Sequence, residues 1–176
     1  GGRIVRIFGA SLYITERKIL ESRMKDALEL TERIIANAPL GVATFRGSGE
    51  CVSVNDAYLE IIGAPDRETA LAMNFHWLAP WKETGQYQRA LEALETGQSR
   101  SAIIHMTTIF GREVWINTRL VPFSVKEEPH LLLMMDDITP LKRSEMAARE
   151  GMLFVNSLIE TMPNPVFYKD MELRYI

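Results

Sequence analysis

Two adjacent carboxylates, Asp136 and Asp137, are the residues of this sequence best placed for acid–base chemistry. Neighbouring carboxylates raise one another's pKa, which allows one to act as a general acid and the other as a general base. They follow the apolar run Leu131–Met135, which predicts a strand, and successive side chains of a strand point to opposite faces. We therefore expect the two carboxylates to be apart, with Asp137 fixing the end of the strand. The sequence shows no Ser/His/Asp set, phosphate-binding glycine loop or paired-carboxylate cleft, so we predict no catalytic residues.

The three histidines and the single cysteine do not have the pattern of a metal site. No two histidines have the spacing of metal ligands, and Cys51 by itself forms neither an internal disulfide nor a multi-thiolate site. His105 is expected on the strand face opposite an apolar row, and His130 in the turn before the last strand. His76 lies between two aromatic residues and is expected to be a packing residue. The sequence thus predicts no metal.

Composition limits the class of protein. The 176 residues are 47% hydrophobic and 24% charged, which suits one compact domain with helical extensions. The formal net charge of −3, with both signs interspersed, provides no basic stripe for nucleic acid. The run Leu131–Met135 is far shorter than a membrane span, and the first residues lack the pattern of a signal peptide. We expect a cytoplasmic segment without direct membrane contact, in a parent protein that is free to carry a membrane anchor elsewhere.

The alternation of apolar and polar residues predicts one antiparallel sheet that positions these groups. Short helices are expected at Asp56–Ile62, which Gly63 ends, and at Tyr87–Glu95, which Gly97 ends. The strands are expected, in order, at Val42–Phe45, Cys51–Asn55, Ala102–Thr107, Glu113–Leu120 and Leu131–Asp137. Five strands in two groups, interrupted by short helices, indicate an α+β domain.

The two ends of the chain repeat its middle at one offset. Thr15 and Thr139 lie 124 positions apart, and Pro39 and Pro163 have the same separation. Matching caps, prolines and apolar positions indicate a segment of a tandem array of like domains, in which Ile4–Phe8 would be a strand of the copy before. We expect residues 1–15 to end a preceding repeat, 16–38 to form a connector helix, 39–139 a complete domain, 140–162 a second connector and 163–176 the start of a following repeat.

The first connector carries a seam of apolar residues. Spacings of four and three place Leu20, Met24, Ala27 and Ile34 along one face of a helix, interrupted by Thr31. The second connector presents its seam in the same phase, with smaller residues that make it looser. We expect these helices to form a weak homodimer and to pass rotations or register shifts between domains. The alternative is that they are solvated linkers that pack on their own domain.

Several residues, in this order, resemble a PAS domain, a sensory module of bacterial signalling proteins. They are Val54-Asn55 followed by Ala57-Tyr58 and Gly63, the turn and strand Gly111–Trp115, and Asp137-Ile138-Thr139. The resemblance covers about residues 30–139. Tyr13–Lys18 resembles the end of a preceding PAS domain, and Pro163–Asp170 the beginning of a following one.

The resemblance implies that the concave face of the sheet and the short helices enclose a cavity for a small molecule. The residues expected to line it are Tyr58, Phe75, His76, Ile104, Met106, Ile116, Thr118, Leu133 and Met135. Methionines make such an apolar pocket adaptable. The same side chains are equally able to pack the pocket shut.

The resemblance disfavours covalent flavin and haem as cofactors. Flavin-photoreceptor relatives need a reactive cysteine in the central helices, where this chain has Asn74–Leu78, and they place a glutamine where it has Met135. Haem-binding relatives generally take a histidine from the long central helix, and Tyr87–Glu95 contains none. The sequence requires no cofactor, and the identity of any ligand stays open.

The function implied by the resemblance is sensory. Binding of a small molecule or a partner would alter the sheet, and Asp137, Ile138 and Thr139 would relay the change through the second connector. The receiver would be an output domain outside this segment, by resemblance most often a histidine kinase and next a diguanylate cyclase or phosphodiesterase. Neighbouring repeats and this output domain would be partners within the chain. The alternatives are a structural dimerisation spacer with a packed core and a haem or flavin redox sensor.

Overall fold

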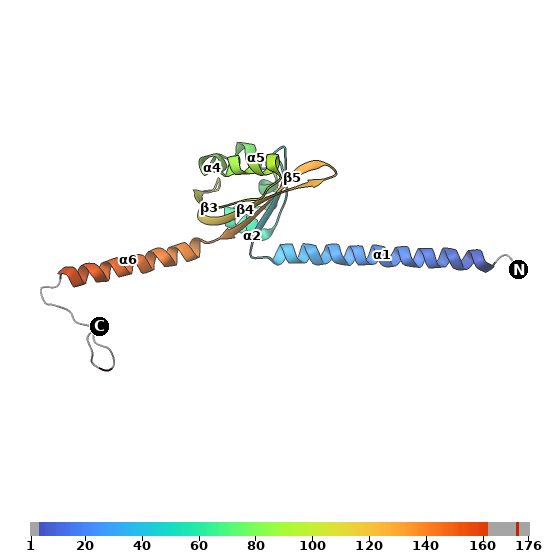
Figure 1. Ribbon diagram of the computed structural model, residues 1–176, viewed down its shortest axis with the longest axis horizontal. Helices are drawn as coiled ribbons and strands as arrows, with labels where there is room; N and C mark the ends of the chain where they lie inside the picture. Colours follow the sequence, from blue (N-terminus) through green and yellow to red (C-terminus); the bar gives the residue numbers. More distant parts are fainter. Residues whose placement is uncertain (1–3, 162–171, 173–176) are drawn as a thin grey trace. The chain divides into compact units, whose positions relative to one another are not determined.

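The computed structural model describes residues 4–161 and residue 172. Its centre is a five-stranded sheet, and Figure 1 shows the short helices α4 and α5 over one face of that sheet. The strands are β1 (Gly41–Arg46), β2 (Cys51–Val54), β3 (Arg100–Thr107), β4 (Glu113–Val125) and β5 (Glu128–Asp137). The short helices are α2 (Asp56–Ile62), α3 (Arg67–Leu71), η1 (Phe75–Trp77), α4 (Ala79–Glu83) and α5 (Gln86–Thr96).

All neighbouring strands of the sheet are antiparallel, in the order β2-β1-β5-β4-β3. This confirms the predicted α+β class with one antiparallel sheet. β1 and β5, the first and last strands in the sequence, lie side by side, with Gly41 opposite Met135. The chain therefore enters and leaves the sheet at adjacent positions.

β4 and β5 extend further than the sequence pattern predicted. β4 continues to Val125 and β5 begins at Glu128, so that Lys126 and Glu127 form the turn, with φ angles of 49° and 69°. The expectation that His130 lies in this turn is wrong, because it is buried on β5. Its ring centroid is 5.4 Å from that of Phe123 on β4. Each strand supplies the other with backbone hydrogen bonds, so the hairpin continues where side-chain alternation fades.

The strand predicted at Ile4–Phe8 is wrong, because α1 is one continuous helix over Ile4–Asn37 and passes Thr15 without a break. A strand satisfies its backbone groups only beside another strand, and no strand among the described residues pairs with this segment. A helix satisfies those groups within the segment itself. The assignment of residues 1–15 to a preceding repeat stays a prediction. The expected start of a following repeat at 163–176 lies outside the described residues except for residue 172.

The core fills the space between the inner face of the sheet and the short helices. Phe75 of η1 stacks on Trp81 of α4 with ring centroids 5.4 Å apart, and Phe45 of β1 meets both rings edge-on. Ile116 of β4 and Leu133 of β5 are almost wholly buried beneath them in the same cluster. Large aromatic and aliphatic side chains thus occupy most of the interior.

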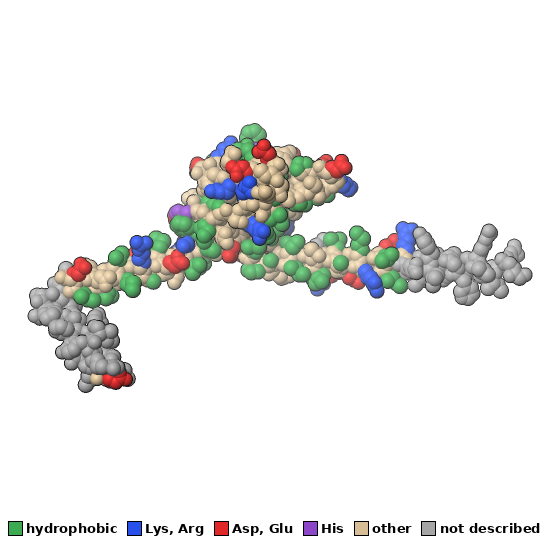
Figure 2. All heavy atoms as spheres, viewed as in Figure 1, with side chains coloured by type: hydrophobic (Ala, Val, Ile, Leu, Met, Phe, Trp, Pro, Cys, Tyr) green, Lys and Arg blue, Asp and Glu red, His purple; other side chains and the backbone are tan. Residues whose placement is uncertain are grey.

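The chain divides into two compact units, Gly1–Asp137 and Ile138–Ile176, and the second contains the long helix α6 (Thr139–Thr161). Figure 2 shows hydrophobic side chains exposed along both α1 and α6. On α1 they include Leu20, Met24 and Ile34, whose exposed fractions are 65%, 78% and 61%. Among the described residues, no helix is long and apolar enough to cross a membrane. The apolar surface of the long helices is instead available for packing against another surface.

Candidate functional site

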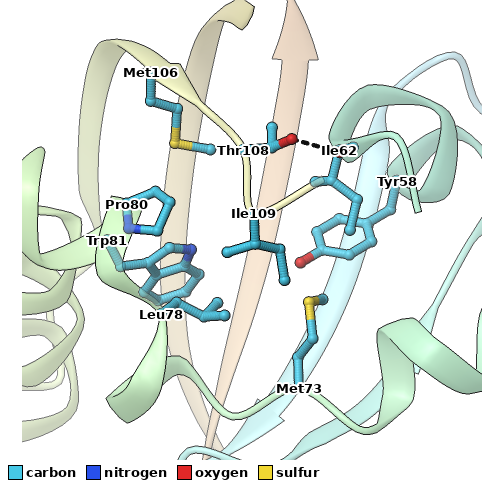
Figure 3. Close-up of a pocket in the computed structure, with 9 residues that line it drawn as sticks. All are labelled: Tyr58, Ile62, Met73, Leu78, Pro80, Trp81, Met106, Thr108 and Ile109. Atoms are coloured by element: carbon cyan, nitrogen blue, oxygen red, sulfur yellow. Dashed lines mark hydrogen bonds between the residues drawn. The ribbon is translucent and has the colours of Figure 1, made fainter. Parts of the chain in front are cut away.

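A small cavity lies between α2, α4 and the turn that follows β3 (Figure 3). Its volume is about 20 Å³, which is enough for about one water molecule. Its walls are Tyr58, Ile62, Met73, Leu78, Pro80, Trp81, Met106, Thr108 and Ile109. Sites for larger metabolites measure several hundred Å³. In this conformation the cavity fits a water molecule or a diatomic gas, and a larger ligand requires the walls to move.

Two of the nine residues predicted to line a pocket, Tyr58 and Met106, are walls of this cavity. His76 is half-buried outside it, where Nδ1 lies 3.2 Å from the hydroxyl oxygen of Tyr87. The other six pack in the core and are not walls of the cavity: Phe75, Ile104, Ile116, Thr118, Leu133 and Met135. The space that the resemblance suggested for a ligand is thus largely taken up by these side chains themselves.

Sequence reasoning missed most walls of the cavity. Ile62 follows Tyr58 by four residues on α2, and this spacing indicates that the two share one face of the helix. Thr108 and Ile109 belong to the turn between β3 and β4 and have no such local signal. Thr108 reaches the cavity because its Oγ1 donates a hydrogen bond to the carbonyl of Ile62, at 2.7 Å. Only the packing of the turn against α2 reveals this part of the site.

A buried polar pair lies deeper in the core. Thr118 Oγ1 is 3.3 Å from Gln86 Oε1 and 3.1 Å from the carbonyl oxygen of Ala102, yet a hydroxyl donates only one proton at a time. Gln86 Nε2 is buried without a hydrogen-bond partner among the described residues. Exchanging the amide N and O of Gln86 would let Nε2 donate to Thr118. In the orientation present, the unsatisfied N–H groups of the buried carboxamide carry a cost of about 1–3 kcal/mol.

The buried cysteine and tyrosine near the cavity are both kept protonated. Burial raises the pKa of Cys51 to about 11, and the hydrogen bond from its thiol to the carbonyl of Ser53 opposes this only partly. Burial also raises the pKa of Tyr58, and the neighbouring Cys51 adds a smaller effect in the same direction. A neutral thiol is a poor nucleophile and a poor metal ligand. The described part of the chain also contains no group of three His, Cys, Asp or Glu residues arranged to hold a metal.

Asn55 joins the end of α1 to the start of the domain. Its Nδ2 donates to the carbonyl oxygens of Ile35, at 2.9 Å, and Leu40, at 2.8 Å. Its Oδ1 accepts from the backbone N–H groups of Val42, at 2.8 Å, and Tyr58, at 2.9 Å, the latter as N-cap of α2. The four bonds use the full capacity of this buried carboxamide. Asn55 therefore fixes α1, β1 and α2 to one another.

Arg112 makes the corresponding connection at the end of the domain. Its Nη2 forms an ion pair with Asp137 Oδ2, at 3.1 Å, and its Nη1 donates to the carbonyl oxygen of Glu60 in the last turn of α2. The backbone N–H of Arg112 donates to Thr108 Oγ1, at 3.2 Å, which in turn holds the carbonyl of Ile62. The end of β5 is thereby tied to the C-terminal end of α2.

A surface hollow of about 360 Å³ lies where these two connections approach each other. Both residues of the ion pair, Arg112 and Asp137, border it, together with parts of α2 and the segment after α1. Its lining is Ala36, Ala38, Pro39, Asp56, Ala57, Glu60, Ile61, Arg112 and Asp137. The hollow marks the region in which the first connector, α2 and the last strand meet.

The three residues predicted to relay a signal lie on both sides of the boundary between the units. Asp137 is the last residue of β5 and holds the ion pair with Arg112. Thr139 is the first residue of α6, and the carbonyl of Ile138 accepts a hydrogen bond from Lys142 N, at 2.9 Å, in the first turn. One residue therefore separates the sheet from the second connector.

The fold is a small α+β domain. Its core lies between one antiparallel sheet and the short helices that cover one face of that sheet. The sequence model of the family described as PAS fold matches residues 35–143, which is most of the chain. The chain belongs to the PAS family, and this confirms the resemblance seen in its sequence.

Solved structures of PAS domains have the same fold. The PAS domain of an HTR-like protein from Haloarcula marismortui is 18% identical with a TM-score of 0.57, covering 69% of this chain and 99% of that chain. A PAS domain from Colwellia psychrerythraea is 18% identical with a TM-score of 0.56, covering 65% and 98%. One from a two-component sensor histidine kinase is 15% identical with a TM-score of 0.53, covering 65% and 98%. At these identities the likeness shows the fold alone. No curated protein matches the sequence.

Proposed function

We propose that this segment is a non-catalytic sensory domain that passes a change in its core, or in a bound partner, to an output domain of the same protein. The observation that carries the proposal is the position of β5. It pairs with β1 on one side and β4 on the other, its inner face forms part of the core, and it ends one residue before α6. β5 therefore links the core directly to the second connector, so a change in the core has a short route to it.

The input is a small ligand that opens the core, or a partner. Two observations support a ligand: the cavity beside Tyr58, and the unsatisfied carboxamide atom of Gln86, which a ligand or water with a complementary polar group would satisfy. The small volume of the cavity favours a ligand of few atoms. Haem and covalent flavin are not part of the proposal, since α5 contains no histidine and Cys51 is a buried residue of β2.

The partners are a second copy of this chain, the neighbouring repeats and the output domain. The exposed apolar seam of α1, with Leu20, Met24, Ala27 and Ile34, supports pairing of the connector helices in a homodimer. A histidine kinase is the first candidate for the output domain, and a diguanylate cyclase or phosphodiesterase the second. These candidates rest on the family, and a PAS domain from a two-component sensor histidine kinase is among the structures with this fold.

The proposal is tested on the purified chain by its native absorbance spectrum and by native mass spectrometry, followed by identification of any small molecule released on denaturation. We expect a colourless protein. A stoichiometric released molecule would support ligand sensing, and its loss in Gln86→Met would place it at the buried carboxamide. The matched control is Gln98→Met, an exposed position after α5. A Soret or flavin band would contradict the proposed input and favour a redox sensor.

The second candidate is a structural dimerisation spacer with a packed core. The water-sized cavity and the tightly stacked Phe75 and Trp81 favour it. A spacer predicts that no small molecule is bound and that none in a metabolite library changes the melting temperature. A sensor predicts that at least one compound raises it, because a ligand that binds only the folded state stabilises that state.

A further inference from the structure

Helix α2 is held at both ends by side chains that also hold the end of α1 and the end of β5. At its N-terminal end, Asn55 caps α2 and donates to Ile35 and Leu40, at the end of α1 and just after it. At its C-terminal end, Arg112 donates to the carbonyl of Glu60 and pairs with Asp137. A helix of seven residues is about 10 Å long. One short rigid element thus spans the distance between the two attachments.

The same helix forms one wall of the cavity. Tyr58 and Ile62 point from α2 into it, as Figure 3 shows. Thr108, in the turn after β3, lines the cavity as well and donates a hydrogen bond to the carbonyl of Ile62. Ile62 has an exposed fraction of 6% and Tyr58 of 2%, so both side chains belong to the packed interior, where a shift of one group is passed to its neighbours. A change in the contents of the cavity is therefore expected to move α2 as a whole.

We propose that α2 is the element that couples the two connectors: a displacement that begins at the first connector or in the cavity is passed along α2, and through Arg112, to Asp137. The proposal rests on the proposed function for its biological meaning, since a relay serves a sensory domain. It differs from a relay through the sheet alone, because the route leaves the β1–β5 pairing and runs through one guanidinium group.

Gly41 provides a way to displace α2 without removing any hydrogen bond. A Cβ atom at this position would lie 2.9 Å from Ile61 Cδ1 and 3.1 Å from Tyr58 Cα, closer than normal contacts. Gly41 has no positive φ, so alanine there causes no backbone strain of its own. Gly41→Ala is therefore a wedge between β1 and α2.

The test is a double-mutant cycle on the full chain, followed by amide hydrogen exchange and mass spectrometry. Gly41→Ala is expected to speed exchange in α2 and, by about fivefold or more, in residues 134–139, a factor at the lower end of measured allosteric couplings. In the Arg112→Ala background the same wedge should still act on α2 but should add less than twofold at residues 134–139, because the connection to Asp137 is gone.

Arg67→Ala is the matched control. Arg67 also binds α2, through Asp56, and donates to the backbone carbonyl of Val54, whereas the ion pair with Asp137 belongs to Arg112. In this background the wedge should keep its full effect at residues 134–139. Arg112→Lys keeps the positive charge but lacks the planar fork that reaches two acceptors at once, and it should behave like Arg112→Ala. Circular dichroism confirms that each variant is folded.

Two results would overturn the proposal. If Gly41→Ala changes exchange at residues 134–139 equally with and without Arg112, the effect travels through the pairing of Gly41 with Met135 in the sheet. If the wedge leaves these residues unchanged, α2 and the end of β5 are not coupled. Neither result would affect the ligand test of the proposed function, because the cycle requires no ligand and no output domain.

Discussion

At the scale of single residues, this domain places its polar side chains where the backbone has unpaired groups. Asn55 satisfies two carbonyl groups and two N–H groups around the start of α2, and Arg112 satisfies a carbonyl at its end. Gln86 is the exception among the described residues, with a buried Nε2 that has no partner. Cys51 is a different case, since its polar atom is buried and kept neutral.

The buried thiol of Cys51 leads to a prediction about reactivity. Burial raises its pKa from the ordinary 9.0 to about 11, so at about pH 8 the folded protein should hold about 100-fold less thiolate than the unfolded chain. Reaction with Ellman's reagent should be slower by at least that factor in native buffer than in denaturant. Cys51→Ala gives the background rate.

The same shift predicts a dependence of stability on pH. A raised pKa in the folded state means that the unfolded chain releases its proton first, so the contribution of Cys51 to stability is complete below about pH 9 and is lost as the pH approaches 11. Cys51→Ala should remove this part of the alkaline decline in urea titrations. Equal thiol reactivity in the folded and unfolded protein would show that Cys51 is accessible and would contradict both expectations.

At the scale of the elements, the long hairpin of β4 and β5 contains the least favourable turn of the domain. Lys126 and Glu127 both have positive φ, which suits glycine or asparagine and strains other residues. Two-residue turns of this kind match the twist of the strands, and the ten paired positions between β4 and β5 are long enough to impose one. The pairing of β4 with β5 therefore imposes the conformation of the turn, which is unfavourable for the two residues that form it.

Replacing both turn residues should stabilise the protein. The double variant Lys126→Asn with Glu127→Gly supplies the residues that this turn prefers, and we expect the free energy of unfolding to rise by about 1 kcal/mol. The substitution removes one positive and one negative charge, so the net charge is unchanged. Urea unfolding measures the change.

A control in the neighbouring strand distinguishes turn geometry from a general effect of glycine. Ser124→Gly lies in β4, where φ is not positive, and should lower the free energy of unfolding by about 0.5–1 kcal/mol. A double turn variant that is no more stable than the parent would mean that the two positive φ angles carry no strain.

At the scale of the whole molecule, a long helix precedes the domain in the sequence and another follows it, and both expose apolar residues in the part of the chain that the structure describes. The described side chains of α1, at residues 17–31 and 33–37, are exposed, and α6 exposes a set of apolar side chains that includes Met152, Phe154 and Leu158. Helices of this kind gain most of their stability from packing their apolar face. A second copy of the chain offers the same seams at the same spacing in sequence, which is why a homodimer is the assembly that we propose.

The seam of α1 gives a direct test of this assembly. Leu20→Glu combined with Ile34→Glu puts charges into the seam, and sedimentation should show the dissociation constant of the dimer rising by about tenfold or more. Ser22→Glu, on another face of the same helix, is the control and should change it little. A wild-type chain that is monomeric at high concentration, or a seam variant that dimerises normally, would refute pairing through α1.

Local patterns in the sequence determined the positions of the five strands, the C-terminal ends of α2 and α5, and the family. Gly63 and Gly97 were identified as helix stops, and both are the left-handed caps of α2 and α5. Such signals depend on side chains a few residues apart, so they can be seen without the fold. The pattern at Ile4–Phe8 failed because a strand needs a partner from elsewhere, whereas a helix does not.

Only the tertiary structure decided where the site lies. Thr108 and Ile62 are 46 positions apart, and Arg112 and Glu60 are 52 apart, so no local pattern indicates that they touch. The size of the cavity is a still less local property, because it is the small volume left after many large side chains have packed. The sequence therefore determined that this chain contains a PAS domain, and the packing decided that its interior is nearly full and that α2 is attached to the end of α1 and to the end of β5.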